Sequence, residues 1–222
     1  MSDWPITVAE RSARTHGRRT LAKLLDAAVD ELASHGYHGA RMGRIAKAAG
    51  VAHGTLYVYF ADKADLLAAL QSEADAELRR ALLAMPPIEP GPSGRDSLAS
   101  WAGDVCAVFQ RYGAVFQALA EALSDDEQSV AGRAGLRSMR ATTAHMAERL
   151  RAACGESPEF DAEIAAICLF AMIEGGNRAL HRGELPASGG ELPASGGELA
   201  DEIARFVQRA AFGNRPLKGA RG

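Results

Sequence analysis

The chain has 222 residues, of which 47% are hydrophobic and 24% are charged, and its formal net charge is −3. A chain of this length and balance is typical of a globular protein with one large domain or two small ones. Three cysteines, never spaced as C-x-x-C, argue against a disulfide framework or a structural zinc site. Without a long apolar run or a signal-peptide core, we expect a cytoplasmic protein and no membrane partner.

The charge is unevenly distributed along the chain. Residues 1–66 carry nine Lys or Arg and seven Asp or Glu, a balance of +2, whereas the remainder has a balance of −5. A basic end on an acidic body suits a protein whose N-terminus meets phosphate. Four arginines near this end either form a minor-groove arm or, as we favour, belong to a solvated tail: Arg11, Arg14, Arg18 and Arg19.

Nearly every periodic segment has helical spacing, which predicts an all-α fold. Apolar residues recur at i, i+3, i+4, i+7, i+8 and i+11 over residues 21–32, and Gly36 is expected to end this helix with a positive φ. A second long helix is expected to start near Asp62, whose carboxylate caps the first turn, with Asp65 three residues on. It should end at Met85, before two prolines.

The second half of the chain continues in helices after a Pro- and Gly-rich loop over residues 86–95. The expected helices occupy about 96–112, 114–123, 126–153, 159–182 and 198–212. Expected helix starts are a capping-box pattern at residues 124–127 and an N-cap before a proline at Ser157-Pro158. A tandem repeat, GELPASG-GELPASG-GEL, is too rich in Gly, Pro and Ser to bury a core, so residues 183–197 are interpreted as a flexible loop.

Residues 41–60, RMGRIAKAAGVAHGTLYVYF, have the pattern of a helix-turn-helix. Its first helix buries Met42, Ile45, Ala46 and Ala49, Gly50 turns the chain, and its second helix buries Leu56 and Phe60. The exposed face of the second helix suits a DNA major groove, and Gly54 allows close backbone approach to a base edge. Its polar and aromatic members are His53, Thr55, Tyr57, Val58 and Tyr59.

The spacing IA-x-x-AGV-x-x-GTLY-x-YF-x-x-K-x-x-L, within a match from Leu21 to about Leu67, resembles the TetR/AcrR family of regulators. The resemblance implies an N-terminal three-helix DNA-binding domain with a helix-turn-helix, a connecting fourth helix, and a C-terminal helical ligand-binding and dimerisation domain. The expected organisation is a flexible basic arm (1–17), the DNA-binding domain (18–66), the ligand-binding and dimerisation domain (67–213) and a flexible tail (214–222).

The resemblance implies a set of DNA-binding residues by position. Expected to face bases are His53, Gly54 and Thr55, with Arg44 as an additional reader. Expected to hold phosphates are Tyr57, Tyr59 and Lys63.

Three positions depart from the pattern of the family. Ala52 stands where a capping Ser or Thr is usual, which costs about 1 kcal/mol locally. Arg41 replaces a usual capping Thr and would trade the cap for a phosphate contact. Val58 replaces a residue that is often polar or aromatic, which puts a backbone contact there in doubt.

Beyond residue 67 the resemblance is architectural, and the body is expected to hold a ligand and a second copy of the chain. An aromatic- and Met-lined interior with a few polar groups predicts a hydrophobic ligand. The expected ligand-binding residues are Trp101, Cys106, Phe109, Tyr112, Phe116, Met139, His145, Met146, Glu174 and Asn177. The expected dimer interface pairs the last two helices with their copies through Ile164, Ile167, Cys168, Ala171, Ile203, Phe206, Val207 and Ala210.

The implied function is a homodimeric transcriptional regulator, most commonly a repressor, released from a palindromic double-stranded DNA operator by a small-molecule inducer. Two recognition helices must lie about 34–36 Å apart to read such a site, and ligand would change that separation through the helix that starts at Asp62. No cofactor and no enzymatic activity are expected, since no catalytic constellation or phosphate loop is present. The alternatives are a DNA-binding protein without an inducer, such as a chromosome organiser or partner-controlled regulator, and a metal sensor using His35 and His38.

Overall fold

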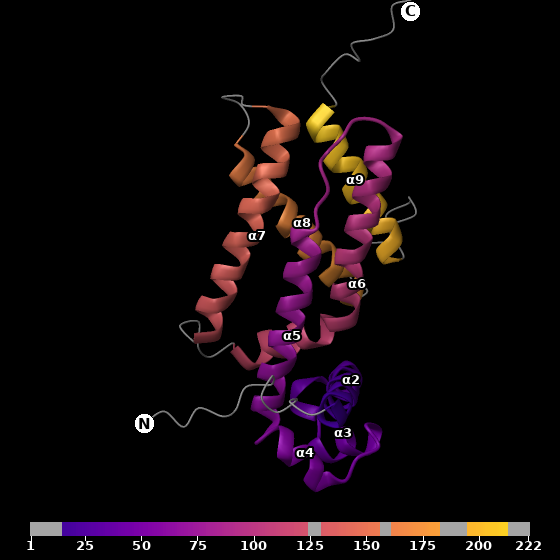
Figure 1. Ribbon diagram of the computed structural model, residues 1–222, viewed down its shortest axis with the longest axis vertical. Coiled ribbons are helices and arrows are strands. Elements are labelled where there is room, and N and C mark those ends of the chain that lie inside the picture. The colour runs from indigo at the N-terminus through magenta and orange to yellow at the C-terminus, as the bar shows by residue number, and fades with distance from the viewer. Residues whose placement is uncertain (1–14, 124–129, 156–160, 183–194, 213–222) are drawn as a thin grey trace, which may run out of the picture. The chain divides into compact units, whose positions relative to one another are not determined.

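The computed structural model describes residues 15–123, 130–155, 161–182 and 195–212 (Figure 1). Within these ranges there are eight helices and no strand, which confirms the predicted all-α class. In chain order they are α2 (Thr15–Gly39), α3 (Met42–Ala48), α4 (His53–Tyr59), α5 (Lys63–Leu83), α6 (Pro92–Leu123), α7 (Val130–Cys154), α8 (Ala162–Arg182) and α9 (Gly196–Phe212). None of these helices is both long and apolar enough to span a membrane.

The chain divides into two units. The first comprises Met1–Asp75 and Arg111–Glu127, and the second comprises Ala76–Gln110 and Gln128–Gly222. The helices α5 and α6 therefore each contribute residues to both units.

The first unit is built around the apolar faces of α2 to α5. The helix α2 packs against α3, and α3 packs against α4. With only seven residues each, α3 and α4 have too few internal hydrogen bonds to be stable alone, so this shared core holds them. Its buried side chains include Leu24, Leu25, Ala28, Leu32, Ile45, Ala46, Ala49, Leu56, Phe60, Leu66 and Leu70.

The helix α2 differs from the prediction at its start and agrees with it at its end. Gly36 has φ 63° and ψ 178° and interrupts the helix. The predicted positive φ at this residue is therefore confirmed. The helix begins at Thr15, so Arg18 and Arg19 are exposed helical residues, and the interpretation of these two as a solvated tail is wrong. Arginine is a good helix former and needs only a solvated face, which allows the helix to extend past the apolar stripe. Arg11 and Arg14 lie outside the described residues.

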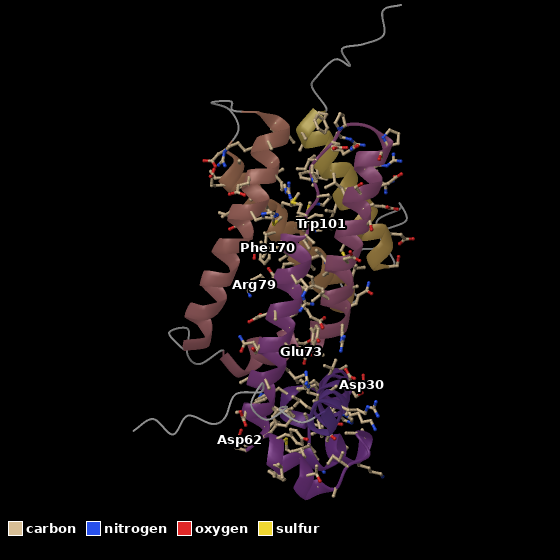
Figure 2. All side chains as sticks on the ribbon, in the orientation of Figure 1. Asp30, Asp62, Glu73, Arg79, Trp101 and Phe170 are labelled. Atoms are coloured by element: carbon tan, nitrogen blue, oxygen red, sulfur yellow. The ribbon has the colours of Figure 1, made fainter. Side chains whose placement is uncertain are left out.

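The start of α5 follows the prediction closely. The backbone N–H of Asp65 donates to Asp62 Oδ1 at 2.8 Å, and the Ala61 N–H donates to Asp65 Oδ2 at 3.0 Å (Asp62 is labelled in Figure 2). The two carboxylates thus satisfy backbone donors reciprocally, as in a capping box.

The structure has one long helix, α6, where the sequence predicted two helices at 96–112 and 114–123. It begins at Pro92, since proline fits the first turn of a helix, and it continues through Gly113. A glycine inside a helix costs about 1 kcal/mol. Here Tyr112 and Val115, on either side of it, are 1% and 0% exposed, and their burial outweighs that cost.

The second unit is a helical bundle in which α7, α8 and α9 pack against one another. In the same unit the indole N–H of Trp101, on α6, donates to the Ala81 carbonyl of α5 at 2.9 Å (Trp101 is labelled in Figure 2). A Cβ added at Gly176 would lie 3.1 Å from Leu199 Cδ1, so α8 and α9 approach closely there. Gly176 therefore has a reason to be glycine, whereas a Cβ added at Gly175 would meet nothing within 4 Å among the described residues.

The start of α8 differs from the predicted one. The helix α8 begins at Ala162 rather than at 159, because Asp161 Oδ1 accepts the N–H groups of Glu163 and Ile164 at 3.0 and 3.1 Å. Ser157-Pro158 and the expected cap at residues 124–127 lie outside the described residues.

The helix α9 begins inside the tandem repeat. The Glu198 N–H donates to Ser195 Oγ and the Ser195 N–H donates to a Glu198 carboxylate oxygen, both at 3.3 Å, which is a capping box. Gly196 and Gly197 are therefore helical, and the predicted loop extended two residues too far. Residues 183–194 of that loop lie outside the described residues.

Candidate nucleic-acid interface

Two short helices, α3 and α4, are joined by a tight turn. The helix α3 closes as the Ala49 N–H donates to the Ile45 carbonyl at 2.9 Å, and the Val51 N–H donates to the Ala46 carbonyl at 3.0 Å. Gly50 has φ 68°, a conformation that L side chains rarely adopt. The predicted helix-turn-helix is therefore present, with glycine at the position where the backbone requires it.

The helix α4 has an inner and an outer face. Leu56 and the adjoining Phe60 are 0% exposed, whereas Tyr57 is 47% and Val58 77% exposed. His53 is exposed as well. Large side chains on the outer face of so short a helix add nothing to the core, so this face is available to a partner.

Gly54 lies at the exposed start of α4. A Cβ added to it would meet no atom of the described residues within 4 Å, and its φ is not positive. Neither sterics nor backbone conformation within the first unit therefore requires glycine at this position. Its neighbour Thr55 is half-buried.

Neither helix of the motif has a side-chain cap. Ala52 and Arg41 occupy the N-cap positions of α4 and α3 in extended backbone conformation, and neither side chain bonds a backbone N–H. The sequence predicted that a side-chain cap is missing at these two positions, and the structure confirms this for both.

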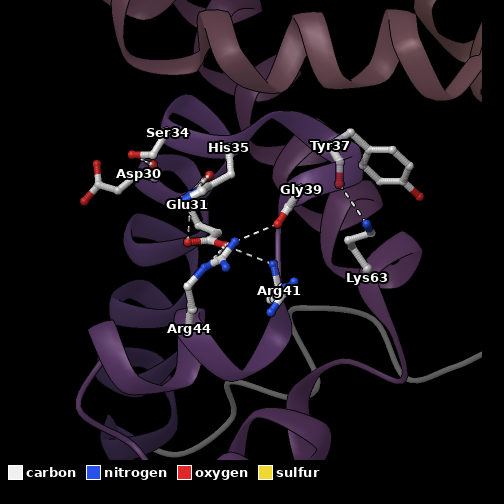
Figure 3. A network of polar contacts seen from close by, with 9 residues as sticks. All are labelled: Asp30, Glu31, Ser34, His35, Tyr37, Gly39, Arg41, Arg44 and Lys63. Carbon is white, nitrogen blue, oxygen red and sulfur yellow. Dashed lines mark hydrogen bonds and ion pairs between the residues drawn. The ribbon is translucent and has the colours of Figure 1, made fainter.

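Tyr59 and Lys63, two of the expected phosphate contacts, are tied to α2. The Tyr59 hydroxyl donates to the Gly17 carbonyl at 3.4 Å. Lys63 Nζ donates to the Tyr37 carbonyl at 2.7 Å and lies 4.5 Å from the centroid of the Tyr37 ring (Figure 3). An ammonium group has three donors, so Lys63 can keep this bond while another donor meets a phosphate.

The two arginines of α3 differ in their surroundings. The guanidinium of Arg44 contacts the carboxylate of Glu31 and the Gly39 carbonyl, whereas Arg41 is exposed. Sequence reasoning missed Glu31. The available signal was its place three residues after Ala28 and next to Leu32, because a carboxylate beside a buried stripe needs a partner.

The residues expected to bind a ligand do not all fall in one unit. Tyr112 and Phe116 belong to the first unit, and the others belong to the second. Those of the second unit that are buried are Trp101, Cys106, Phe109, Met146 and Asn177. The side chain of Met139 lies outside the described residues.

The structure brings two of these residues together. Asn177, 4% exposed, donates from Nδ2 to the Ile173 carbonyl at 2.8 Å and lies 3.4 Å from the Cys106 sulfur. Burial raises the pKa of the Cys106 thiol, although the contact with Asn177 acts in the opposite direction. Asn177 Oδ1 has no hydrogen-bond partner in the part of the chain that the structure describes, and the same holds for the buried Nε2 of His145.

Glu174 does not join this pair. It lies one turn before Arg178 and forms an ion pair with it at 3.4 Å, with both side chains substantially exposed. Glu174 is therefore held in a surface ion pair, whereas Asn177, three residues later on the same helix, is buried.

The expected dimer face divides into exposed and buried residues. Exposed on α8 are Ile164 (59%), Ile167 (53%), Cys168 and Ala171, and exposed on α9 are Phe206 (55%) and Ala210. Ile203 and Val207, each 2% exposed, lie in the core of the second unit, so their assignment to the interface is a misprediction. They belong to the inner stripe of α9, which is buried within the same chain.

This arrangement of short helices defines a helix-turn-helix protein. Residues 24–70, from α2 to α5, match the family described as "Bacterial regulatory proteins, tetR family". The chain thus contains the segment that this family model describes, and this segment includes the helix-turn-helix.

Similar proteins include regulators known from sequence and from structure. Over 51 residues the chain is 49% identical to the fatty acid metabolism regulator protein of Bacillus subtilis, a match that spans 23% of this chain and 26% of that protein. A TetR-like transcriptional regulator from Rhodococcus sp. RHA1 shares the fold with a TM-score of 0.58 and 22% identity, over 93% of this chain and 98% of that one. A TetR family transcriptional regulator from Thermus thermophilus has a TM-score of 0.57 and 18% identity, over 84% and 97%.

Proposed function

We propose that the protein is a sequence-specific DNA-binding transcriptional regulator that acts in the cytoplasm as a homodimeric repressor and leaves a palindromic operator when a small hydrophobic ligand binds. The observation that carries the DNA-binding part is the outer face of α4, which presents Tyr57 and Val58 to solvent on a helix anchored by Leu56. Regulators of the TetR family bind DNA and are not enzymes, in line with this proposal.

In this proposal α4 enters the major groove and its neighbours hold the backbone. His53, Gly54 and Thr55, at the start of α4, read base edges, and the open space around Gly54 permits the closest approach. Tyr57, Tyr59, Lys63 and Arg41 contact phosphates.

A second copy of the chain covers the exposed stripe of α8 and α9. Ile164, Ile167, Cys168 and Ala171 follow one another at i, i+3, i+4 and i+7, a continuous stripe along α8. A stripe of exposed apolar side chains on two adjacent helices is typical of a four-helix interface between identical chains.

The ligand binds within the second unit, where Asn177 supplies the polar contact. Its buried Oδ1 lacks a partner among the described residues, and such an acceptor gains most from a bound donor. Cys106, which contacts Asn177, and Met146 of the same unit are both buried, and apolar surroundings select a hydrophobic molecule.

The name of the Bacillus subtilis relative supports only part of this proposal. The matched segment is 49% identical over 51 residues, which is 23% of this chain, so the name carries no information on the rest of the chain. A long-chain acyl compound is nevertheless the first ligand class to test, because it satisfies the hydrophobic requirement of the second unit.

The test is footprinting of the purified protein on the DNA that flanks its own gene, followed by selection from random duplexes if no site is protected there. The proposal predicts protection of a palindrome, lost in a variant with both Tyr57→Ala and Lys63→Ala. A matched control is Arg95→Ala, which removes an exposed charge from the second unit. A folded dimer that protects no sequence at low salt would contradict the proposal.

A further inference from the structure

The side chain of Glu31 is buried in the first unit, on the face of α2 that meets α3. It is 8% exposed and is the one charged residue buried to this depth among those the structure describes. A carboxylate is rarely buried unless it is paired, since removing it from water is costly. The partners of Glu31 therefore indicate what it does.

Two of its three partners lie at the start of α3. Glu31 Oε1 accepts the backbone N–H of Arg41 at 2.9 Å and the Nε–H of Arg44 at 2.7 Å (Figure 3). Arg44 Nη2 lies 2.6 Å from the same oxygen and also donates to the Gly39 carbonyl at 2.6 Å. One carboxylate thus fixes the backbone at the start of α3 and the side chain one turn into it.

The remaining oxygen faces α2 itself. Glu31 Oε2 lies 3.2 Å from His35 Nδ1, one turn later on the same helix. Burial alone would raise the pKa of Glu31. The hydrogen bonds from Arg44 and Arg41, with the charges of Arg44 and His35, outweigh burial and lower it, so the carboxylate is ionised at neutral pH.

Glu31 replaces a helix cap that α3 lacks. In a capping box the acidic side chain stands at the third helical residue and accepts the N–H of the N-cap residue. Here the N-cap residue is Arg41, the third helical residue is Arg44, and the carboxylate comes from α2. The cap is therefore supplied by a neighbouring helix, and position 41 does not need a capping side chain.

We propose that Glu31 is the positioning residue of the DNA-binding surface, which holds the start of α3 and retains Arg44, so that Arg41 alone of these two arginines contacts a DNA phosphate. Arg41 is exposed, and its guanidinium has no hydrogen bond or ion pair with the residues described here. The inference rests on the proposed DNA-binding function, and it replaces the expected base-reading role of Arg44 by a structural one.

The salt dependence of DNA affinity separates the two roles. Each phosphate contact releases a condensed counterion, so losing one reduces the slope of log K against log salt by about 1. With the duplex protected in the footprint as the probe, Arg41→Ala is expected to reduce the slope by about 1, and Arg44→Ala to leave it unchanged. A slope reduced equally by Arg44→Ala would overturn the assignment.

Amide hydrogen exchange of α3 tests the cap without DNA. Glu31→Gln is expected to accelerate exchange in α3 and to weaken DNA binding. The control Asp26→Asn, which removes an exposed ion pair from the same helix, is expected to change neither. Adding Arg41→Thr to Glu31→Gln supplies a side-chain cap, so protection of α3 should return while the salt slope stays reduced by about 1. Equal exchange in Glu31→Gln and Asp26→Asn would refute the role of Glu31.

A further variant tests the inference even if Glu31→Gln or Arg44→Ala fails to fold. Removing one member of a buried ion pair is strongly destabilising, whereas replacing both by apolar residues is often neutral. Glu31→Leu with Arg44→Leu is therefore expected to fold and to bind DNA more weakly, at an unchanged salt slope. Wild-type affinity in this double variant would overturn the inference. Failure of the wild-type protein to bind any duplex would overturn the proposed function and this role with it, while exchange in α3 would still decide whether Glu31 is the cap.

Discussion

The ring of His53 stands edge-on to the ring of Tyr57, one turn later on α4, with centroids 5.1 Å apart and planes inclined by 69°. Aromatic rings favour this geometry because the positive edge of one meets the negative face of the other. Both side chains are exposed, so the contact orders two members of the outer face in the absence of DNA. Less conformational entropy is then lost when α4 binds.

His53 and Tyr57 are expected to affect DNA binding in different ways. A base contact specifies sequence, whereas a phosphate contact strengthens binding to every sequence alike. His53→Ala should therefore remove about 1–3 kcal/mol of discrimination at one base pair of each half-site. Tyr57→Phe, which keeps the ring contact, should weaken all sites equally. Selection from randomised duplexes measures both, and a uniform loss with His53→Ala would exclude it from base reading.

Gly54→Ala is expected to raise stability and abolish tight DNA binding. The added methyl group meets nothing within 4 Å in the described residues, and alanine is favoured over glycine in a helix by about 1 kcal/mol. The same methyl group would stand between the backbone of α4 and a base edge. Thermal unfolding and operator affinity should therefore change in opposite directions. Retained affinity would show that the backbone does not approach DNA at this residue.

Ala52→Ser should stabilise the DNA-binding unit by about 0.5–2 kcal/mol. Ala52 already has the extended backbone of an N-cap residue, φ −65° and ψ 145°, and its side chain provides no acceptor. A serine hydroxyl there can accept an N–H group of the first turn of α4. Ala48→Ser, at the exposed last residue of α3, is the control and should give no gain. Urea unfolding gives the two free energies, and equal values would refute the missing cap.

Local features of this fold were predictable where a residue has a single physical reason for its place. Gly36 and Gly50 adopt positive φ, and Asp62 caps α5. The inner face of α4 follows from the spacing of Leu56 and Phe60. Each of these depends on neighbours within a few residues, so the sequence pattern carries the information.

Tertiary contacts decided the features that were mispredicted or missed. The pair formed by Glu31 and Arg44 joins residues 13 apart through a kinked helix end, which no periodicity reveals. Gly113 resembles a helix break, but buried neighbours carry α6 through it. The apolar residues of α9 could pack either against their own chain or against a second copy of it. Only the packing shows that Ile203 is buried within its own chain, whereas Phe206 is exposed.

Ile167→Glu is expected to convert the dimer to monomer. Ile167 is 53% exposed on the α8 stripe, and a charge there would lie inside the proposed interface. Leu83→Glu, at another large exposed apolar residue, should leave the dimer intact. Light scattering gives the mass, and the neighbouring Cys168 gives a second measurement. Its exposed thiol should react slowly with a thiol reagent in the wild-type dimer and rapidly in Ile167→Glu. Unchanged mass and reactivity would place the interface elsewhere.

Asp75→Asn should stabilise the protein at neutral pH but not in acid. Burial raises the pKa of the Asp75 carboxyl, so the folded chain binds its proton more tightly than the unfolded chain does. A group of this kind contributes stability below its unfolded pKa, about 3.9, and loses that contribution as pH rises through the higher folded pKa. The amide stays neutral, so the gain in unfolding free energy should grow with pH across that window and then level off. Asp104→Asn, at an exposed site on α6, should give no such profile. If Asp75→Asn gave the same change at every pH, the carboxylate would not be the source of the effect.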